Sequence, residues 1–337
     1  MNPHRNVAWV RRTRLAITTL AALAAGAFGY APALQAQTAY PAKPVRLVVG
    51  FSAGGPTDVV ARAFAEYAGR TLGQSFIVDN KPGANTILAA EAVAAAPADG
   101  YTLLLGATNH TMIPALYSAR VKFDALRSFA PVCTLANSPT VLVVGPSLPA
   151  KTLADFLAQV RARPGERTYG TPGSGSSGHF AAEQFTRLTG TRMNHIPYKG
   201  AAQAVTDLMG GQVDSSFATL ASVLPQIQAG KLTALAVAAP KRSGLLPAVP
   251  TFEESGVKDY AADAWYGLLA PAGTPPEVLA ALTRVAGEFT RAPATVDKLR
   301  GMGLDAQNTC GGAFAAQMDR EIRSATQIAR ALNLKVE

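Results

Sequence analysis

Short runs of apolar and β-branched residues alternate with helical patterns along most of the chain. Residues 45–51, 75–78, 101–105 and 141–144 form such runs and predict strands. Residues 57–72 predict a helix, because apolar side chains recur along one face and charged side chains along another. Strands that alternate with helices favour an α/β fold built on parallel sheets.

The same alternation continues to the C-terminus. Further helices are predicted at 87–96, 152–162 and 201–209, further strands at 195–198, 213–218 and 232–238, and two C-terminal helices around Val278–Phe289 and Phe314–Leu332. Residues 232–238 are apolar apart from Thr233, as a strand buried in a parallel sheet would be. Ligands of parallel sheets bind at the carboxyl ends of the strands, so the loops at those ends are the candidate sites.

A Gly/Ser-rich loop at residues 170–179, Gly-Thr-Pro-Gly-Ser-Gly-Ser-Ser-Gly-His, joins a strand-like run to a helical pattern. A loop that opens a helix presents free backbone N–H groups and the positive end of the helix dipole, so it favours an anion. Gly173, Gly175 and Gly178 also have the G-x-G-x-x-G spacing of a dinucleotide site.

The surrounding residues argue against a nucleotide. A dinucleotide site needs an acidic residue about 20 positions further on, and residues 191–198 contain none. A P-loop needs Lys and Ser/Thr where His179 and Phe180 stand. The serine hydroxyls and backbone N–H groups of the loop suit a carboxylate instead.

A second glycine-rich loop, residues 51–58, follows the first predicted strand directly. Gly54 and Gly55 permit close approach of the backbone to a ligand, and Asp58 falls in the first turn of the next helix. Taken alone, this loop is equally well explained as an ordinary turn. Taken with residues 170–179, it predicts two loops that face each other across a cleft and hold one anion.

Residues 1–36 have the pattern of a secretory signal peptide. Four arginines and no acidic residue precede an apolar run at 15–29, and Leu34-Gln35-Ala36 ends the segment in a small residue. A membrane anchor is the alternative, but the run is short against the roughly 20 residues that span a bilayer. Arg11-Arg12 also permits a twin-arginine signal, although general export is preferred. We expect cleavage near Ala36 and a periplasmic mature protein.

Charge and cysteine content add limits. Removal of the four arginines lowers the formal net charge from +9 to +5, which does not indicate a nucleic-acid partner. The length suits two α/β domains. Cys133 and Cys310 lack metal-site spacing, and either a disulfide or two separate buried thiols fits the sequence.

No catalytic set emerges from the sequence. His179 either contacts the anion or bonds to the loop backbone, the interpretation we favour. His110 follows another strand end and either lines the cleft or supports it. Trp265 and Tyr266 either stack on a ligand or belong to the core. We therefore expect a binding protein with no catalytic residue, no cofactor and no metal.

Many short motifs along the mature chain resemble the Bug/TctC family, the extracytoplasmic solute-binding proteins of tripartite tricarboxylate transporters. They are Tyr40–Arg46, Gly54–Asp58 with Arg62, Asn80–Ala84, Pro97–Thr102, Gly173–Ser176 with His179, Ile196–Gly200, Gly210–Asp214, Val249–Thr251 and Ala270–Pro275. Each motif alone is weak, but their order and number make the resemblance specific.

The resemblance implies a type II periplasmic-binding fold, in which two α/β domains are joined by crossover strands and close on a ligand like a hinge. The implied division is residues 37–139 plus 240–337 for one domain and 140–239 for the other. In the family, the loops that match 52–58 and 171–179 hold a ligand carboxylate, often partly through waters.

Two departures from the family pattern bear on the ligand. Asn85 and Thr86 stand where the family often has glycines, so we expect them to reach the cleft. Ala218 stands where many relatives have an Asp that can pair with a ligand ammonium group. Its absence favours a plain carboxylate over an amino acid.

The predicted ligand-binding residues come from these loops and strand ends. They are Ser52, Ala53, Gly54, Gly55, Thr57, Asp58, Asn85, Thr86, Thr108, Asn109, Thr171, Gly173, Ser174, Gly175, Ser176, His179 and Ala218. The predicted function is capture of a small carboxylate by a monomeric periplasmic protein that passes it to membrane transporter subunits. A ligand sensor for a signalling partner and an exported enzyme are the alternatives.

Overall fold

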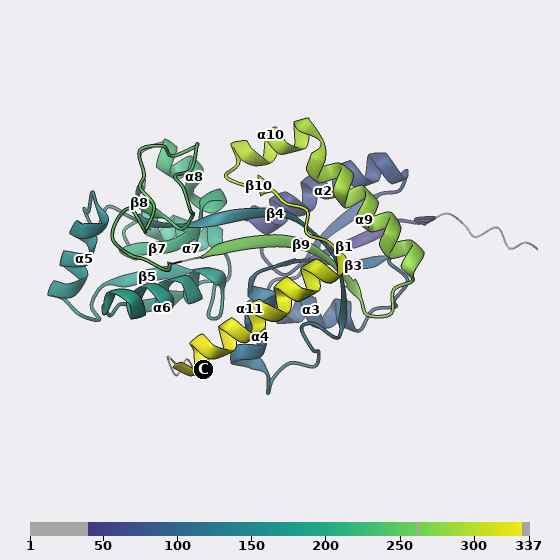
Figure 1. Ribbon diagram of the computed structural model, residues 1–337, viewed down its shortest axis with the longest axis horizontal. Coiled ribbons are helices and arrows are strands. Elements are labelled where there is room, and N and C mark those ends of the chain that lie inside the picture. The colour runs from purple at the N-terminus through teal and green to yellow at the C-terminus, as the bar shows by residue number, and fades with distance from the viewer. Residues whose placement is uncertain (1–39, 261, 332–337) are drawn as a thin grey trace, which may run out of the picture. The chain divides into compact units, whose positions relative to one another are not determined.

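The computed structural model describes residues 40–260 and 262–331 (Figure 1). The predicted signal peptide lies outside the described residues. The elements, in chain order, are β1 (Val45–Val49), α2 (Pro56–Leu72), β2 (Phe76–Asn80), η1 (Ala84–Thr86), α3 (Ile87–Ala94), β3 (Thr102–Ala107), α4 (Asn109–Tyr117), β4 (Phe129–Val144), α5 (Leu153–Ala162), β5 (Thr168–Thr171), α6 (Ser177–Thr189), β6 (Asn194–Pro197), α7 (Ala201–Met209), β7 (Ser215–Thr219), α8 (Leu220–Gln228), β8 (Thr233–Val237), β9 (Asp263–Pro271), α9 (Pro276–Arg291), α10 (Pro293–Gly301), β10 (Asp305–Ala306) and α11 (Gly311–Ala331).

The strands form one mixed sheet in the order β2-β1-β3-β9-β4-β7-β5-β6. It is parallel at both ends, where β1 pairs with β2 and β3, and β5 pairs with β6 and β7. It is antiparallel in the middle, because β9 runs against both β3 and β4. The predicted α/β class is therefore confirmed, with antiparallel strands between two parallel groups.

Strand β4 connects the two groups of strands. Its first part pairs with β9 and β10, and its last part, Thr140–Val144, pairs with β7 and β8. In Figure 1, β4 and β9 run from the strands around β1 and β3 to the strands around β5 and β7. The residues from Tyr40 onward form one compact unit by their contacts, so the predicted division into two domains stays a prediction.

The expectation of a parallel strand at residues 232–238 was wrong. Strand β8 is antiparallel to β4, with Val237 opposite Val141 and Thr233 opposite Val144. A continuous apolar run reports that both faces of a strand are covered, and it does not report the direction of the neighbouring strand.

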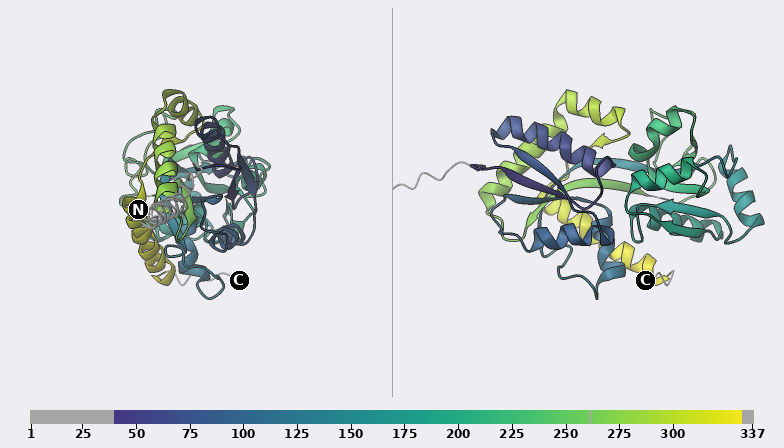
Figure 2. Two further views of the ribbon diagram at one scale, coloured as in Figure 1. Left: turned by 90° about the vertical axis from the view of Figure 1, so that its right-hand side faces the viewer. Right: turned by 180° about the vertical axis from the view of Figure 1, so that it is seen from behind.

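Helices cover both faces of each group of strands. Around β1, β3 and β9, helices α2 and α9 lie on one face and α3, α4 and α11 on the other (Figures 1 and 2). Successive residues of β1 point to opposite faces of the sheet. Leu47 belongs to the same buried cluster as Phe64 of α2, whereas Val48 belongs to the same cluster as Ile113 of α4. Around β5 and β7, α5 and α6 contribute to one core, and α7 and α8 to another.

Local chemistry explains several helix ends. Helix α2 begins with a proline in its first turn and ends at Gly73, which has a φ of 71°. Helix α5 begins with a capping box between Thr152 and Asp155. Helices α4 and α8 were not predicted, since Pro114 and Pro225 lie inside them and proline normally argues against a helix interior.

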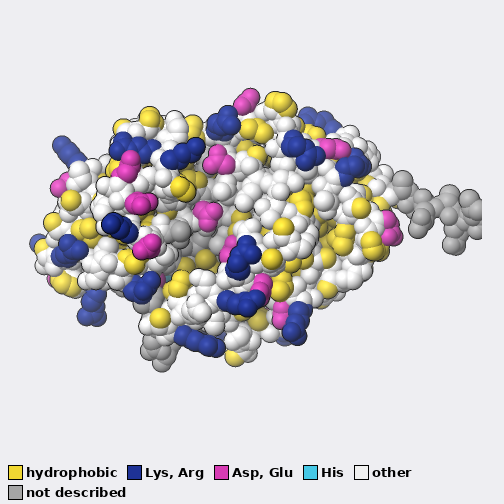
Figure 3. Space-filling view, in the orientation of Figure 1, with side chains coloured by type: hydrophobic (Ala, Val, Ile, Leu, Met, Phe, Trp, Pro, Cys, Tyr) yellow, Lys and Arg dark blue, Asp and Glu magenta, His cyan; other side chains and the backbone are white. Residues whose placement is uncertain are grey.

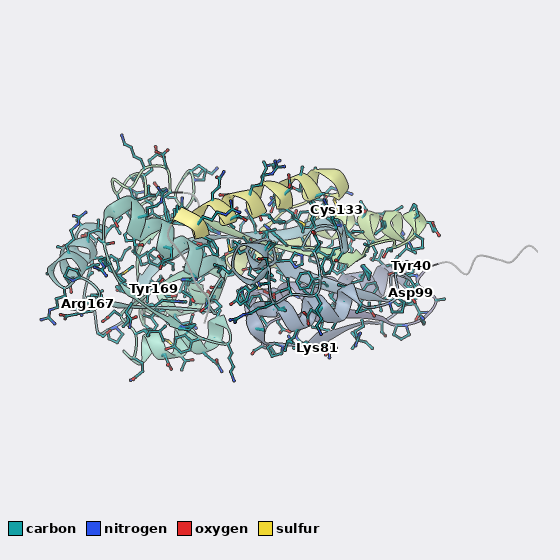
Figure 4. All side chains as sticks on the ribbon, turned by 90° about the horizontal axis from the view of Figure 1, so that it is seen from below. Tyr40, Lys81, Asp99, Cys133, Arg167 and Tyr169 are labelled. Atoms are coloured by element: carbon teal, nitrogen blue, oxygen red, sulfur yellow. A yellow bond between two sulfur atoms is a disulfide. The ribbon has the colours of Figure 1, made fainter. Side chains whose placement is uncertain are left out.

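A disulfide joins Cys133 of β4 to Cys310, the residue before α11. It therefore fixes the start of the C-terminal helix to the long central strand, where Cys133 is labelled in Figure 4. Of the two possibilities that the sequence left open, the structure has the disulfide, which an oxidising compartment permits.

Candidate functional site

A cavity of about 70 Å³ lies among the loops at the strand ends. That volume holds a few water molecules or a small organic ion. Its lining residues are Phe51, Ser52, Gly55, Pro56, Thr57, Ala107, Asn109, Pro172, Ser176, Ser177, Gly200, Ala201, Ala202, Gln203, Thr219, Ala264 and Tyr266. Both glycine-rich loops predicted from the sequence contribute to it.

Four helix N-caps line this cavity. They are Gly55 of α2, Ser176 of α6, Gly200 of α7 and Thr219 of α8. Within residues 40–260 and 262–331, no protein acceptor takes the N–H groups of Thr57, Ser177, Ala201 or Ala202. Unpaired first-turn N–H groups and four positive dipole ends make the cavity a favourable place for an anion.

None of the lining residues is charged. Hydroxyl groups of Ser52, Thr57, Ser176, Ser177 and Thr219 supply further donors, and apolar side chains supply the rest of the wall. On the outer face in Figure 3, basic and acidic side chains are interspersed. Recognition of an anion here therefore depends on neutral donors and helix dipoles.

Asp58 shapes the first loop from outside the cavity. Its carboxylate accepts hydrogen bonds from Arg62 Nε at 2.9 Å, Asn80 Nδ2 at 3.0 Å and the Gly54 N–H at 3.0 Å. Burial acts to raise the pKa of Asp58, but the bonds from Arg62, Gly54 and Asn80 outweigh it and hold the pKa below its usual value. Asp58 and Gly54, both predicted to contact the ligand, here bond to each other.

The second loop is held mainly by its own residues. Ser176 caps α6 by accepting from the His179 N–H at 3.3 Å, and the Gly175 N–H donates to His179 Nδ1 at 3.0 Å. The Tyr117 hydroxyl donates to the Ser174 carbonyl at 3.0 Å. Of the residues predicted in this loop, Ser176 lines the cavity, whereas Thr171, Gly173, Ser174, Gly175 and His179 do not.

His179 belongs to a buried stack under this loop. Its ring lies 4.1 Å from that of His195, which in turn stacks on Tyr169 (labelled in Figure 4). His195 Nε2 bonds to Thr171 Oγ1 at 2.7 Å. Burial lowers the pKa of His179 to about 4, and burial with the neighbouring His179 lowers that of His195 to about 3. The bond from the Gly175 N–H to His179 Nδ1 agrees with the interpretation of His179 as bonded to the loop backbone.

His110 is fully buried away from the cavity. Its Nε2 bonds to the Ala125 carbonyl at 2.8 Å, and its ring packs against Phe123 and Phe129. Burial lowers its pKa to about 4. Of the two roles open for it, the structure gives it a supporting one.

Of the remaining predicted residues, one lines the cavity and the others do not. Asn109 lines the cavity, and its Nδ2 donates to Thr86 Oγ1 at 2.7 Å. Thr108 instead fastens α4 to β9, because its Oγ1 accepts from the Trp265 N–H at 2.8 Å. Ala53, Asn85, Thr86 and Ala218 do not line the cavity.

A third loop and one strand also line the cavity, and neither is among the predicted ligand-binding residues. Gly200–Gln203 follow β6 and open α7, and Ala264 and Tyr266 of β9 form part of the wall. The third loop has the signal that found the other two, a strand followed by a glycine and a helix. For Tyr266 the sequence left open a ligand contact or a place in the core, and the structure puts it in the wall of the cavity. Burial raises the pKa of Tyr266, so it offers a neutral hydroxyl.

In the part of the chain that the structure describes, no three His, Cys, Asp or Glu side chains are grouped as a metal site. Over the same residues, no helix is both long enough and apolar enough to cross a membrane.

Comparison with known proteins adds independent information. The model of the tripartite tricarboxylate transporter family receptor matches residues 60–334. BugT of Bordetella pertussis is 37% identical over 276 residues, which cover 82% of this chain and 84% of BugT.

Two solved structures of bacterial proteins are also similar to this chain over most of its length. An R. palustris protein solved with adipate is 34% identical, with a TM-score of 0.82 over 88% of this chain and 99% of that one. MatC from Rhodopseudomonas palustris, solved with bound malate, is 29% identical, with a TM-score of 0.80 over 86% of this chain and 99% of that one.

Proposed function

Since the chain belongs to the tripartite tricarboxylate transporter receptor family, we propose that it captures a small carboxylate in the cavity and delivers it to the membrane subunits of such a transporter. Receptors of this family are periplasmic solute-binding proteins. Periplasmic placement of this chain agrees with the export pattern of residues 1–36.

The observation that carries the proposal is the meeting of four helix N-termini at a small cavity without charged side chains. An anion placed there receives backbone N–H groups from Thr57, Ser177 and Ala201. A carboxylate suits this set, because its two oxygens accept several hydrogen bonds and its charge is favoured by the helix dipoles.

The size of the cavity limits the ligand. A cavity of about 70 Å³ suits a short organic acid better than a nucleotide. The relatives solved with adipate and malate bind ligands of this class. The cavity wall contains both hydrogen-bond donors and apolar side chains, so it suits a short carbon skeleton with a carboxylate at one end. Phe51, Ala107 and Tyr266 would then contact the carbon skeleton.

Ligand capture is proposed to proceed by hinge closure between residues 37–139 plus 240–337 and residues 140–239. The loops that meet at the cavity come from both parts: Ser52 and Asn109 from the first, Ser176 and Gly200 from the second. The Tyr117 hydroxyl of the first part donates to the Ser174 carbonyl of the second at 3.0 Å, so the two parts contact each other beside the cavity. A ligand that bonds to both sides stabilises the closed arrangement.

A thermal-shift panel of mono- and dicarboxylates tests the proposal. A carboxylate that binds the native state raises the melting temperature as its concentration exceeds Kd, because the stabilisation grows with the logarithm of one plus the ratio of ligand concentration to Kd. A panel in which nucleotides stabilise the protein and no carboxylate does would contradict the assignment. Uptake of the stabilising acid by cells with and without this chain then tests delivery to the membrane subunits.

A further inference from the structure

Two buried amide atoms near the cavity lack hydrogen-bond partners. They are Asn109 Oδ1, an acceptor, and Asn85 Nδ2, a donor. Asn109 is only 3% exposed and lines the cavity. A buried amide atom without a partner is destabilising, so such atoms are rare in folded proteins unless a ligand or water completes them.

The orientation of Asn109 follows from its other bonds. Its Nδ2 donates to Thr86 Oγ1 at 2.7 Å and to the Asn85 carbonyl at 3.2 Å. Exchanging the amide nitrogen and oxygen would turn Oδ1 toward the Asn85 carbonyl, where two acceptors would oppose each other. The oxygen is therefore the atom left for a partner from elsewhere.

The backbone that carries Asn85 is held in an unfavourable conformation. Ala84, Asn85 and Thr86 have φ values of 46°, 50° and 70°, a left-handed region that such residues rarely adopt in succession. The segment is confined from both sides. An added Cβ at Gly50 would lie 2.3 Å from Thr86 Cβ, and one at Gly175 would lie 3.0 Å from Asn85 Nδ2. The fold thus holds the Asn85 amide next to the loop of residues 171–179.

The two unpartnered atoms have complementary chemistry. A hydroxyl group can accept from Asn85 Nδ2 and donate to Asn109 Oδ1, whereas a carboxylate can only accept. An ammonium group can only donate, and no acidic side chain lines the cavity to balance its charge. A hydroxyl is therefore the ligand group that satisfies both atoms without a buried charge.

We propose that Asn109, together with Asn85, is a specificity-determining residue that selects carboxylates bearing a hydroxyl group over the same acids without it. This proposal rests on the proposed function, because the carboxylate at the helix N-termini anchors the ligand. Asn109 lines the cavity, and the Asn85 side chain lies directly behind it, with its Oδ1 3.5 Å from Asn109 Nδ2. A ligand hydroxyl is proposed to meet the two amides at this point.

Calorimetric titration of the wild-type protein with matched acids tests the proposal. The pairs are malate against succinate and lactate against propionate, with both enantiomers of each hydroxy acid. The preferred hydroxy acid is expected to bind about tenfold tighter or more, because the acid without the hydroxyl leaves both amide atoms unpaired.

The outcomes separate this proposal from the proposed function. Binding of carboxylates with equal affinity within both pairs overturns the hydroxyl assignment and leaves the proposed function standing. Failure of all carboxylates to bind counts against the proposed function. Aspartate bound more tightly than malate also overturns the assignment, in favour of an ammonium group.

Two substitutions locate the effect. Asn109→Leu keeps the approximate size and removes the acceptor, so the malate-to-succinate affinity ratio is expected to fall toward one. Thr86→Val is the matched control, because it removes one acceptor of Asn109 Nδ2 and leaves the Asn85 carbonyl and Asn109 Oδ1 in place; both acids are expected to weaken together and the ratio to persist. A ratio that collapses equally in Thr86→Val indicates a merely structural role and overturns the proposal.

A third variant covers the case in which Asn109→Leu does not fold. Asn85→Gly removes the unpartnered donor at a position whose φ of 50° glycine adopts readily. The malate-to-succinate ratio is again expected to fall. A ratio that stays at the wild-type value in this variant removes Asn85 from the proposal.

Discussion

Asp58 influences the cavity without lining it. Its carboxylate gathers the Gly54 N–H, Arg62 and Asn80, so it sets the path of the loop that carries Ser52 and Gly55. The Asp58 side chain is only 4% exposed, whereas that of Arg62 is 55% exposed. The ion pair between Asp58 and Arg62 is therefore partly shielded from solvent and holds the loop in place. An ion pair fully exposed on the surface would contribute little to stability.

At Gly175, the structure predicts a defect in ligand binding. A side chain there would meet Asn85 Nδ2 and Leu116 Cδ1 at 3.0 Å, and the φ of 77° suits glycine. Gly175→Val should lift the loop and draw Ser176 and Ser177 away from the ligand. Carboxylate affinity, measured by calorimetry, is expected to fall about tenfold or more, as for the loss of one or two charge-assisted hydrogen bonds.

Gly190→Val is the matched control for this experiment. Gly190 has a φ of 63° at the end of α6, and an added Cβ there meets nothing within 4 Å. Both variants carry backbone strain, so both are expected to melt at lower temperature. Only Gly175→Val is expected to lose affinity for the carboxylate. Equal affinity in the two variants would contradict the explanation that the loop of residues 171–179 holds the ligand.

The stacked histidines predict a loss of stability in acid. Burial holds the pKa of His179 near 4, below the ordinary value of 6.5 that applies in the unfolded chain. The unfolded state therefore binds more protons between these values, so the stabilisation is complete above pH 6.5 and declines as the pH falls toward 4. For His179 alone, the loss amounts to about 3 kcal/mol.

Denaturant titrations at pH 7 and pH 5 measure this effect. His195→Phe preserves the stack on Tyr169 and His179 but cannot take a proton, so the free energy of unfolding should change less with pH in this variant. His110, whose pKa is also about 4, remains and sets a common background. An unchanged pH dependence in His195→Phe would count against a role for the stack.

At the scale of secondary structure, the cavity is a meeting point of helix starts. Helices α2, α6 and α7 direct their N-termini to it because each follows a strand through a short glycine-containing loop. In a parallel arrangement the carboxyl ends of the strands lie at one edge, so successive loops converge there. No charged side chain is needed for an anion site built in this way.

The N-terminus of α7 can be tested by removing one N–H group. Ala201 is its first residue, a position where proline is tolerated because the N–H has no partner within the helix. Ala201→Pro should leave the helix intact and remove a donor from the cavity. Carboxylate affinity is expected to fall about tenfold or more.

Ala201→Ser provides the comparison, because it retains the N–H group with a side chain of similar size. It is expected to bind the carboxylate more tightly than Ala201→Pro, while circular dichroism reports equal helix content in both. Equal affinity of the two variants would show that this N–H group does not hold the ligand.

At the scale of the whole molecule, the long strands β4 and β9 determine how the proposed domains can move. Strand β4 pairs with β9 before Thr140 and with β7 and β8 after it, so its middle is the natural place for bending. Ser138 braces this region, because its Oγ donates to the Gly303 carbonyl and accepts from the Ala221 N–H. A hinge here would open the cavity while leaving both parts folded.

The hinge predicts that ligand makes the protein more compact in solution. Small-angle scattering of the wild-type protein is expected to give a smaller radius of gyration with a saturating carboxylate than without it. Gly175→Val, tested at the same ligand concentration, should show less compaction. A radius of gyration that is identical with and without ligand in the wild-type protein speaks against closure.

The strand-then-helix pattern could be predicted over most of the chain because burial leaves a periodic record in the sequence. It found β1, α2, β3, α5 and α7 within a few residues. It did not find α4 and α8, whose internal prolines interrupt the pattern, or the antiparallel direction of β8. Strand direction depends on which distant segment lies alongside, and no local pattern records that.

The sequence by itself determined that glycine-rich loops at strand ends would offer backbone donors to an anion, because those properties belong to the loop and the helix that follows it. Only the tertiary structure decided which donors remain free. It bound Asp58 to Arg62 and Gly54, buried His179 against His195, and brought Gly200–Gln203 and Tyr266 to the same cavity. Each of these outcomes depends on contacts between segments far apart in the chain, which packing alone establishes.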